Sequence, residues 1–175
     1  MSNAIVVLNA GSSSIKFSLA YGCAKAFREV GAELAVTFLN DKAKPYVEPL
    51  AKEMEAAIFL PLDVSKPGEL EAVFDRIGRE WGQLDILVHS IAFAPKEDLQ
   101  GGLLNCSSGG FSTAMDISCH SFIRIARLAA PLMKDGGTMF AMSYMGGASR
   151  ARPCMWTGAP ASWRRVDGMP AAKSG

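Results

Sequence analysis

The run Leu84–Pro95 constrains the fold of this chain more than any other segment. Apolar residues follow one another from 86 to 88 without alternation, which is typical of a strand covered on both faces in a parallel sheet. The polar and small residues from His89 onward predict that the chain leaves the sheet there. Ligands of doubly wound folds bind at this carboxyl edge. The run therefore predicts a buried strand over Leu84–Val88 whose end borders a flat cofactor.

Strand patterns alternate with helical patterns along the first 142 residues. Strands are predicted at Ala4–Leu8, Glu33–Phe38, Ala57–Leu60, Leu84–Val88 and Gly137–Met142. Helices are predicted at Tyr21–Val30, Lys42–Glu55, Pro67–Trp81 (capped by Ser65) and Phe111–Met133. Short connections between strands and helices favour right-handed crossovers and a parallel sheet. We expect an α/β fold: a truncated Rossmann-like, doubly wound parallel sheet in three αβα layers, with strand order 3-2-1-4-5 and a nucleotide between the first and fourth strands.

Composition excludes several classes of partner. The 175 residues carry a net charge of +1, so no general attraction to nucleic acid or to a membrane surface is expected. No apolar run approaches membrane-spanning length, and the N-terminus lacks the basic region of a signal peptide. The four cysteines have no metal-ligand spacing and suit a reducing compartment. We expect a cytoplasmic protein without a metal site.

Seven segments between residues 18 and 144 match one protein family in order and in register. They are Ser18–Phe27, Gly31–Ala35, Leu39–Lys42, Leu62–Val64, His89–Pro95, Met115–Ser118 and Met142–Tyr144. Over about residues 18–146 the chain resembles the bacterial NADH-dependent enoyl-acyl carrier protein reductases of the short-chain dehydrogenase/reductase superfamily. The resemblance implies NADH as cofactor and, as substrate, an enoyl thioester carried by acyl carrier protein in fatty acid biosynthesis.

The resemblance also implies roles for cofactor-binding residues. Ser18 and Leu19 would border the pyrophosphate at the first helix, and Leu39 would lie by the adenosine ribose. Asp63 and Val64 would hold the adenine. A carboxylate after a strand can accept a hydrogen bond from the adenine amino group. From the residues alone, Asp63 suits a helix-entry cap equally well.

The same resemblance assigns Ile91 to the nicotinamide side of the site, Ala94 to the acyl substrate and Tyr144 to the catalytic group. In the family, a second tyrosine and then a lysine follow this first tyrosine. They stabilise the enolate oxygen and orient the nicotinamide ribose, respectively. Here Cys154 or Met155 occupies the place of the second tyrosine, and the only later lysine lies in the wrong place. We therefore expect impaired catalysis.

Four residues of chemically active types are expected to be structural. His89 is expected to contact the sheet or its partner helix, and His120 to lie at the surface or at an interface. Cys23 and Cys119 suit small core positions.

The first seventeen residues depart from the reductase pattern. From Asn9 to Phe17 the chain resembles the opening of acetate kinases, which implies Asn9 near magnesium and Lys16 near nucleotide phosphates. This leaves an acetate kinase-like phosphotransferase as an alternative. The segment also has the pattern of a strand and a glycine–serine turn. It is therefore expected to supply the first strand of the reductase domain, with Gly11 near the pyrophosphate.

The resulting domain prediction has three parts: an acetate kinase-like segment over 1–17, a partial reductase domain over 18–146 and an unmatched tail over 147–175. The tail holds five basic residues and only one acidic residue. It also contains three prolines and shows neither a helical nor a strand period. It is expected to be a disordered basic tail. The family's long interface helix is missing from the sequence, which removes the basis for expecting the family's homotetramer. A non-catalytic nucleotide-binding fragment remains a further alternative.

Overall fold

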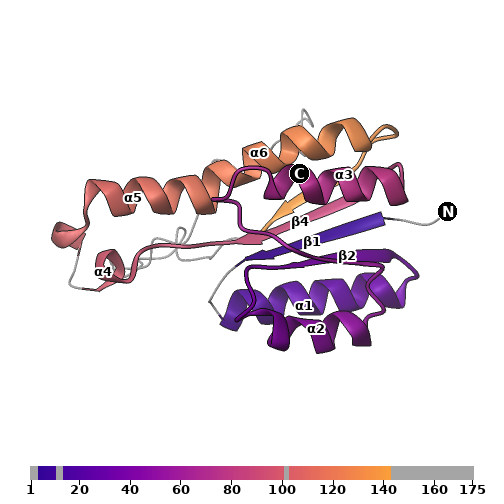
Figure 1. Cartoon of the computed structure of the whole chain (residues 1–175), viewed down its shortest axis with the longest axis horizontal. Helices are drawn as coiled ribbons and strands as arrows, with labels where there is room; N and C mark the ends of the chain where they lie inside the picture. Colours follow the sequence, from indigo (N-terminus) through magenta and orange to yellow (C-terminus); the bar gives the residue numbers. More distant parts are fainter. Residues whose placement is uncertain (1–3, 11–13, 101–102, 143–175) are drawn as a thin grey trace, which may run out of the picture.

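A single parallel sheet of five strands forms the centre of the molecule (Figure 1). The structure, a computed structural model, describes residues 4–10, 14–100 and 103–142. The strands are β1 (Ala4–Ala10), β2 (Glu33–Phe38), β3 (Ile58–Pro61), β4 (Ile86–Ile91) and β5 (Thr138–Ala141). They are ordered β3-β2-β1-β4-β5, and all four neighbouring pairs are parallel. The predicted fold class and strand order are confirmed.

Helices cover both faces of the sheet, which gives the three layers (Figure 1). On one face lie α1 (Ser14–Glu29) and α2 (Lys44–Glu53), and on the other lie α3 (Glu69–Glu80) and α6 (Ser121–Ala129). Beyond the carboxyl ends of the strands are the short α4 (Lys96–Leu99) and α5 (Ser108–Met115). Smaller turns complete the set: 3₁₀ turns η1 (Leu103–Asn105) and η3 (Ala130–Leu132), and a π-helical turn η2 (Asp116–His120). No helix among the described residues is long and apolar enough to cross a membrane.

The apolar core is divided between the two faces of the sheet. Leu62, Ile77, Leu87 and Ile125 belong to a buried cluster under α3 and α6. Leu34 and other apolar residues of β2 pack with α1 and α2 on the opposite face. Because both faces are covered, the strands can carry continuous apolar runs.

The N-terminal segment lies in the middle of the sheet. Strand β1 pairs with β2 on one side, where Val7 faces Val36, and with β4 on the other, where Val7 faces Val88. Thus residues 4–10, the described part of the first strand and turn, supply the central strand of the fold. Gly11 lies outside the described residues.

Several boundaries differ from the predictions. Strand β4 continues to Ile91 instead of ending at Val88, because the polar His89 and Ser90 are buried with partners. Helix α1 begins at Ser14, seven residues before the predicted start at Tyr21, so the last residue of the predicted glycine–serine turn is already its first residue.

The entry to α3 and the long helix also differ. Gly68, in a left-handed conformation with φ of 85°, precedes α3, and Ser65 does not cap it. The helix predicted over Phe111–Met133 begins earlier, at Ser108, and the π-turn η2 divides it into α5 and α6. Helix α4 was not predicted, because its single turn has no periodic pattern to detect.

Candidate functional site

The carboxyl ends of the strands bring the predicted binding residues to one edge of the sheet. Leu39 follows β2 directly, and it packs half-buried against the core cluster under α3. Asp63 and Val64 follow β3, while Ile91 ends β4 and Ala94 lies in the loop after it. At the centre, Ile91 is the register partner of the last residue of β1. Neighbouring strands β1 and β4 continue to helices on opposite faces, so this edge is the topological switch point.

Asp63 lies in a tightly bonded turn. Its Oδ1 accepts hydrogen bonds from the backbone N–H of Ser65 at 3.0 Å and from the Ser65 hydroxyl at 2.5 Å. The backbone N–H of Asp63 donates to Glu69 Oε2 at 2.6 Å. The other carboxylate oxygen, Oδ2, is 4.0 Å from Lys66 Nζ, and the side chain is 24% exposed. One oxygen is therefore used to form the turn, and the second faces outward as an acceptor.

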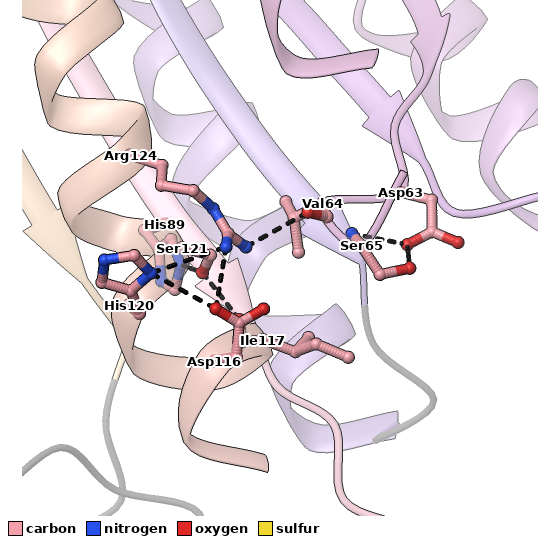
Figure 2. A network of polar contacts seen from close by, with 9 residues as sticks. All are labelled: Asp63, Val64, Ser65, His89, Asp116, Ile117, His120, Ser121 and Arg124. Atoms are coloured by element: carbon pink, nitrogen blue, oxygen red, sulfur yellow. Dashed lines mark hydrogen bonds and ion pairs between the residues drawn. The ribbon is translucent and has the colours of Figure 1, made fainter. Parts of the chain in front are cut away.

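Val64 is linked to the helix on the other side of the site (Figure 2). Its side chain is buried, and its carbonyl oxygen accepts a hydrogen bond from Arg124 Nη2 at 3.1 Å. Nη1 of Arg124 donates to Asp116 Oδ1 at 2.8 Å, and the same carboxylate oxygen is 3.2 Å from His120 Nδ1. The predicted adenine loop is thus attached to η2 and α6.

The loop after β4 is attached to the same helical segment. Ser118 of η2 donates its hydroxyl to the carbonyl of Phe93 and accepts from the N–H of Phe93, both at 3.0 Å. Ile91 is 1% exposed, and Ala94 is half-buried. Ile91 and Ala94, the predicted nicotinamide and substrate residues, therefore lie on either side of Phe93, whose backbone is hydrogen-bonded to Ser118.

A buried polar pair lies beneath the loops (Figure 2). His89 Nε2 is 2.8 Å from Ser121 Oγ, and the Ser121 hydroxyl donates to the carbonyl of Ile117 at 2.6 Å. Because that hydroxyl has one proton, Nε2 of His89 is the donor in the first contact. Phe122 packs edge-on against the imidazole with 5.5 Å between ring centroids. The structural role predicted for His89 is confirmed.

His120 and the two cysteines expected in the core differ in burial. His120 is exposed, as predicted. Cys119 is buried in η2, where burial raises the pKa of its thiol. Cys23 is only half-buried.

Other predicted site residues have less structural support. Ser18 and Leu19 lie in the second turn of α1, so the free N–H groups of the helix N-terminus belong to Ser14–Lys16 instead. Lys16 is in this first turn, and Asn9 is on β1. Tyr144 lies outside the described residues, as do Cys154 and Met155.

The sequence analysis missed Ser118 and Arg124. Both lie in the predicted helix Phe111–Met133, and although Ser118 ends one of the segments that match the reductase family, neither residue was assigned a role. The available signal was the recurrence of polar residues every three positions, Ser118, Ser121 and Arg124, on a helix that is otherwise apolar on its inner side.

Comparisons with known proteins identify the family. The sequence model of the family described as enoyl-(acyl carrier protein) reductase matches residues 14–159. This chain belongs to that family. The predicted family membership is confirmed, and the match extends past residue 147, where the recognised resemblance stopped.

Individual relatives agree with the family match. The NADH-dependent enoyl-[acyl-carrier-protein] reductase of Haemophilus influenzae is 42% identical over 137 residues, covering 78% of this chain and 52% of the relative. The corresponding enzyme of Escherichia coli is 40% identical over 139 residues, covering 79% and 53%. The chain therefore spans about half the length of the curated relatives it matches.

Solved structures are similar over the same part. The NADH enoyl-[acyl-carrier-protein] reductase of Aquifex aeolicus has a TM-score of 0.77 at 36% identity, covering 86% of this chain and 59% of that one. An Anaplasma phagocytophilum reductase in complex with NAD has a TM-score of 0.76 at 38% identity, covering 86% and 56%.

Proposed function

We propose that this chain binds NADH at the carboxyl edge of its sheet. We further propose that its reaction is the reduction of the double bond of an enoyl thioester on acyl carrier protein. The observation that carries the proposal is the position of Asp63–Val64 after β3 and Ile91–Ala94 after β4, on either side of the switch point of a reductase-family fold. A dinucleotide has its two ends far apart, and these two loops offer one site for each end.

The residues after β3 suit an adenine. Asp63 Oδ1 is used within the turn, but Oδ2 remains an outward acceptor that can receive the adenine amino group. The half-buried Leu39 supplies an apolar contact beside the adenosine ribose.

The phosphates would lie between these two loops, near the start of α1. Helix N-termini favour anions because their N–H groups are free and the helix dipole is positive there. Those free N–H groups belong to the first turn, Ser14–Lys16, and we propose Ser18 and Leu19 of the next turn, together with Gly11, as the neighbours of the pyrophosphate.

The residues after β2 favour NADH over NADPH. No arginine follows this strand to meet a 2′-phosphate, and the nearest cations are Lys42 and Lys44. Lys44 Nζ lies 5.9 Å from the centroid of the Phe38 ring. Asn40 Oδ1 accepts a hydrogen bond from the backbone N–H of Lys42 at 3.1 Å, so this side chain is used to form the turn after β2.

NADH supplies a hydride to the β-carbon of the enoyl thioester, and negative charge then develops on the thioester oxygen. In this proposal Ile91 borders the nicotinamide, Ala94 contacts the acyl chain and Tyr144 lies near the thioester. A tyrosine hydroxyl aimed at the oxygen stabilises the developing charge. Because Cys154 or Met155 replaces the second tyrosine, this chain provides that stabilisation poorly.

The unpaired thiols of Cys23, Cys106 and Cys119 suit the reducing cytoplasm as its compartment.

A fluorescence titration with NADH tests the binding step, with ATP and Mg²⁺ as the comparison. We expect saturable binding of NADH and none of ATP with Mg²⁺. The reverse result would contradict the proposal and favour an acetate kinase-like phosphotransferase built on Asn9 and Lys16.

A further inference from the structure

Arg124 of α6 contacts a loop that is 60 residues earlier in the chain. Nη2 donates to the carbonyl of Val64 and Nη1 to Asp116, so the guanidinium joins the helix to the loop after β3 (Figure 2). Its Nε is buried and has no hydrogen-bond partner among the described residues. A buried donor without a partner costs free energy. Packing alone would therefore favour an apolar side chain at this position.

The peptide group between Val64 and Ser65 is held at both ends. Its carbonyl oxygen accepts from Arg124 at 3.1 Å, and its N–H donates to Asp63 Oδ1 at 3.0 Å. A peptide group is planar, so fixing the direction of its carbonyl also fixes the direction of its N–H. That N–H in turn orients the carboxylate of Asp63. One rigid group therefore connects Arg124 to the outward oxygen of Asp63.

We propose that Arg124 is a positioning residue that aims the Asp63 carboxylate at the adenine amino group of NADH. The inference rests on the proposed function and adds a residue that does not itself contact the cofactor. Asp116 orients the guanidinium by accepting from Nη1, which leaves Nη2 directed at Val64. Arginine keeps its charge at every physiological pH, so this contact does not depend on protonation.

The test compares two ligands on the full chain. The first is NADH, and the second is reduced nicotinamide hypoxanthine dinucleotide, in which a carbonyl oxygen replaces the adenine amino group and N1 carries a hydrogen. Arg124→Met keeps much of the side-chain length and removes the donors. Arg127→Met, at an exposed position of the same helix, is the matched control. Fluorescence titration gives the dissociation constant of each variant for each of the two ligands, and the same two constants are measured for the wild type.

We expect the wild type to bind NADH about tenfold more tightly than the hypoxanthine analogue, as one hydrogen bond provides. In Arg124→Met the affinity for NADH should fall about five- to tenfold, while the affinity for the analogue stays within about twofold. The preference between the ligands is thereby lost. Arg127→Met should keep it. Arg124→Lys retains the charge but not the two-pronged geometry, and should keep a preference of about threefold.

An equal loss of affinity for both ligands in Arg124→Met would assign Arg124 to packing and overturn the inference. An unchanged preference would overturn it as well. If the methionine variant does not fold, Arg124→Lys decides by the same comparison. A wild-type chain that binds neither dinucleotide overturns the proposed function itself, and the inference with it.

Discussion

At the scale of single residues, the site depends on how Asp63 is held. Its backbone N–H is bonded to Glu69, and its Oδ1 accepts two hydrogen bonds from Ser65. The sequence left open whether this carboxylate caps a helix or binds a ligand. The structure places the start of α3 six residues further on, after Gly68, so Asp63 does not cap that helix. Its second oxygen, 4.0 Å from Lys66 Nζ, is therefore not used as a helix cap.

We expect Asp63→Ala to weaken NADH binding by about 1–2 kcal/mol, the contribution of one hydrogen bond to a charged acceptor. That corresponds to a roughly 5- to 30-fold increase in the dissociation constant. Asp75→Ala removes the same charge from an exposed position of α3 and should leave binding unchanged. Isothermal titration calorimetry measures both variants. Equal affinities of Asp63→Ala and wild type would remove Asp63 from the cofactor site.

Cysteine reactivity should follow burial. Cys106 is exposed, whereas Cys119 is buried and burial raises the pKa of its thiol. A raised pKa lowers the thiolate fraction at any pH below it, and the thiolate is the species that is alkylated. At pH 8 iodoacetamide should therefore modify Cys106 well before Cys119, as measured by peptide mass spectrometry. Equal rates of alkylation at Cys106 and Cys119 would contradict the burial of Cys119 in η2.

The strand pattern made the position of Asp63 and Val64 at the end of a strand predictable, whereas the cofactor roles of Asp63, Val64 and Ile91 come from the family resemblance and stay predictions. Arg124 was not predictable in the same way, because its partner is a backbone carbonyl 60 residues away. A carbonyl is present at every position, so the sequence carries no mark of the one that is contacted.

At the scale of elements, the π-turn η2 organises the site. Three polar residues on one side of it and of α6 contact three different segments: Ser118 the loop after β4, Ser121 strand β4 and Arg124 the loop after β3. The N–H of Ser121 bonds to the carbonyl of Asp116, five residues back, as a π-turn requires. Apolar periodicity predicted one continuous helix here, since a single widened turn hardly changes the pattern.

The contact between Ser121 and His89 should stabilise the whole domain. Ser121→Ala removes the partner of a buried imidazole nitrogen, and we expect a loss of about 1–3 kcal/mol in the free energy of unfolding. Ser112→Ala, at an exposed position of α5, should change it by less than about 0.5 kcal/mol. Urea denaturation measures both. Two variants of equal stability would show that this buried hydrogen bond contributes little.

At the scale of the whole molecule, the sheet was predictable because its strands are short apolar runs separated by helices. Right-handed crossovers leave few ways to order such strands, and the order β3-β2-β1-β4-β5 follows. The arm formed by α4 and α5 was harder to predict. It lies beyond the sheet, and large apolar residues are exposed at Leu104 of the intervening η1 and at Phe111 of α5, so burial marks neither α4 nor the start of α5 in the sequence.

The division between cofactor binding and chemistry is also a property of the whole molecule. The two loops proposed to bind adenine and nicotinamide belong to the described domain, whereas the resemblance implies that Cys154 or Met155 stands where the family has its second tyrosine. Binding and turnover should therefore separate in this chain. Losing one donor to a developing oxyanion costs about 2.7–4 kcal/mol, a factor of about 10²–10³ in kcat.

We therefore expect the chain to bind NADH and to reduce a crotonyl thioester at least about 100-fold more slowly than the full-length Escherichia coli relative. Oxidation of NADH followed by absorbance gives the rate, and a parallel NADH titration confirms that the protein assayed is folded and loaded. Tyr144→Phe is the informative variant. If Tyr144 only borders the acyl chain, its hydroxyl is dispensable and the residual rate should change little. Turnover close to that of the relative, abolished by Tyr144→Phe, would mean that one tyrosine supplies the whole oxyanion contact and that the substitutions at 154 and 155 do not matter.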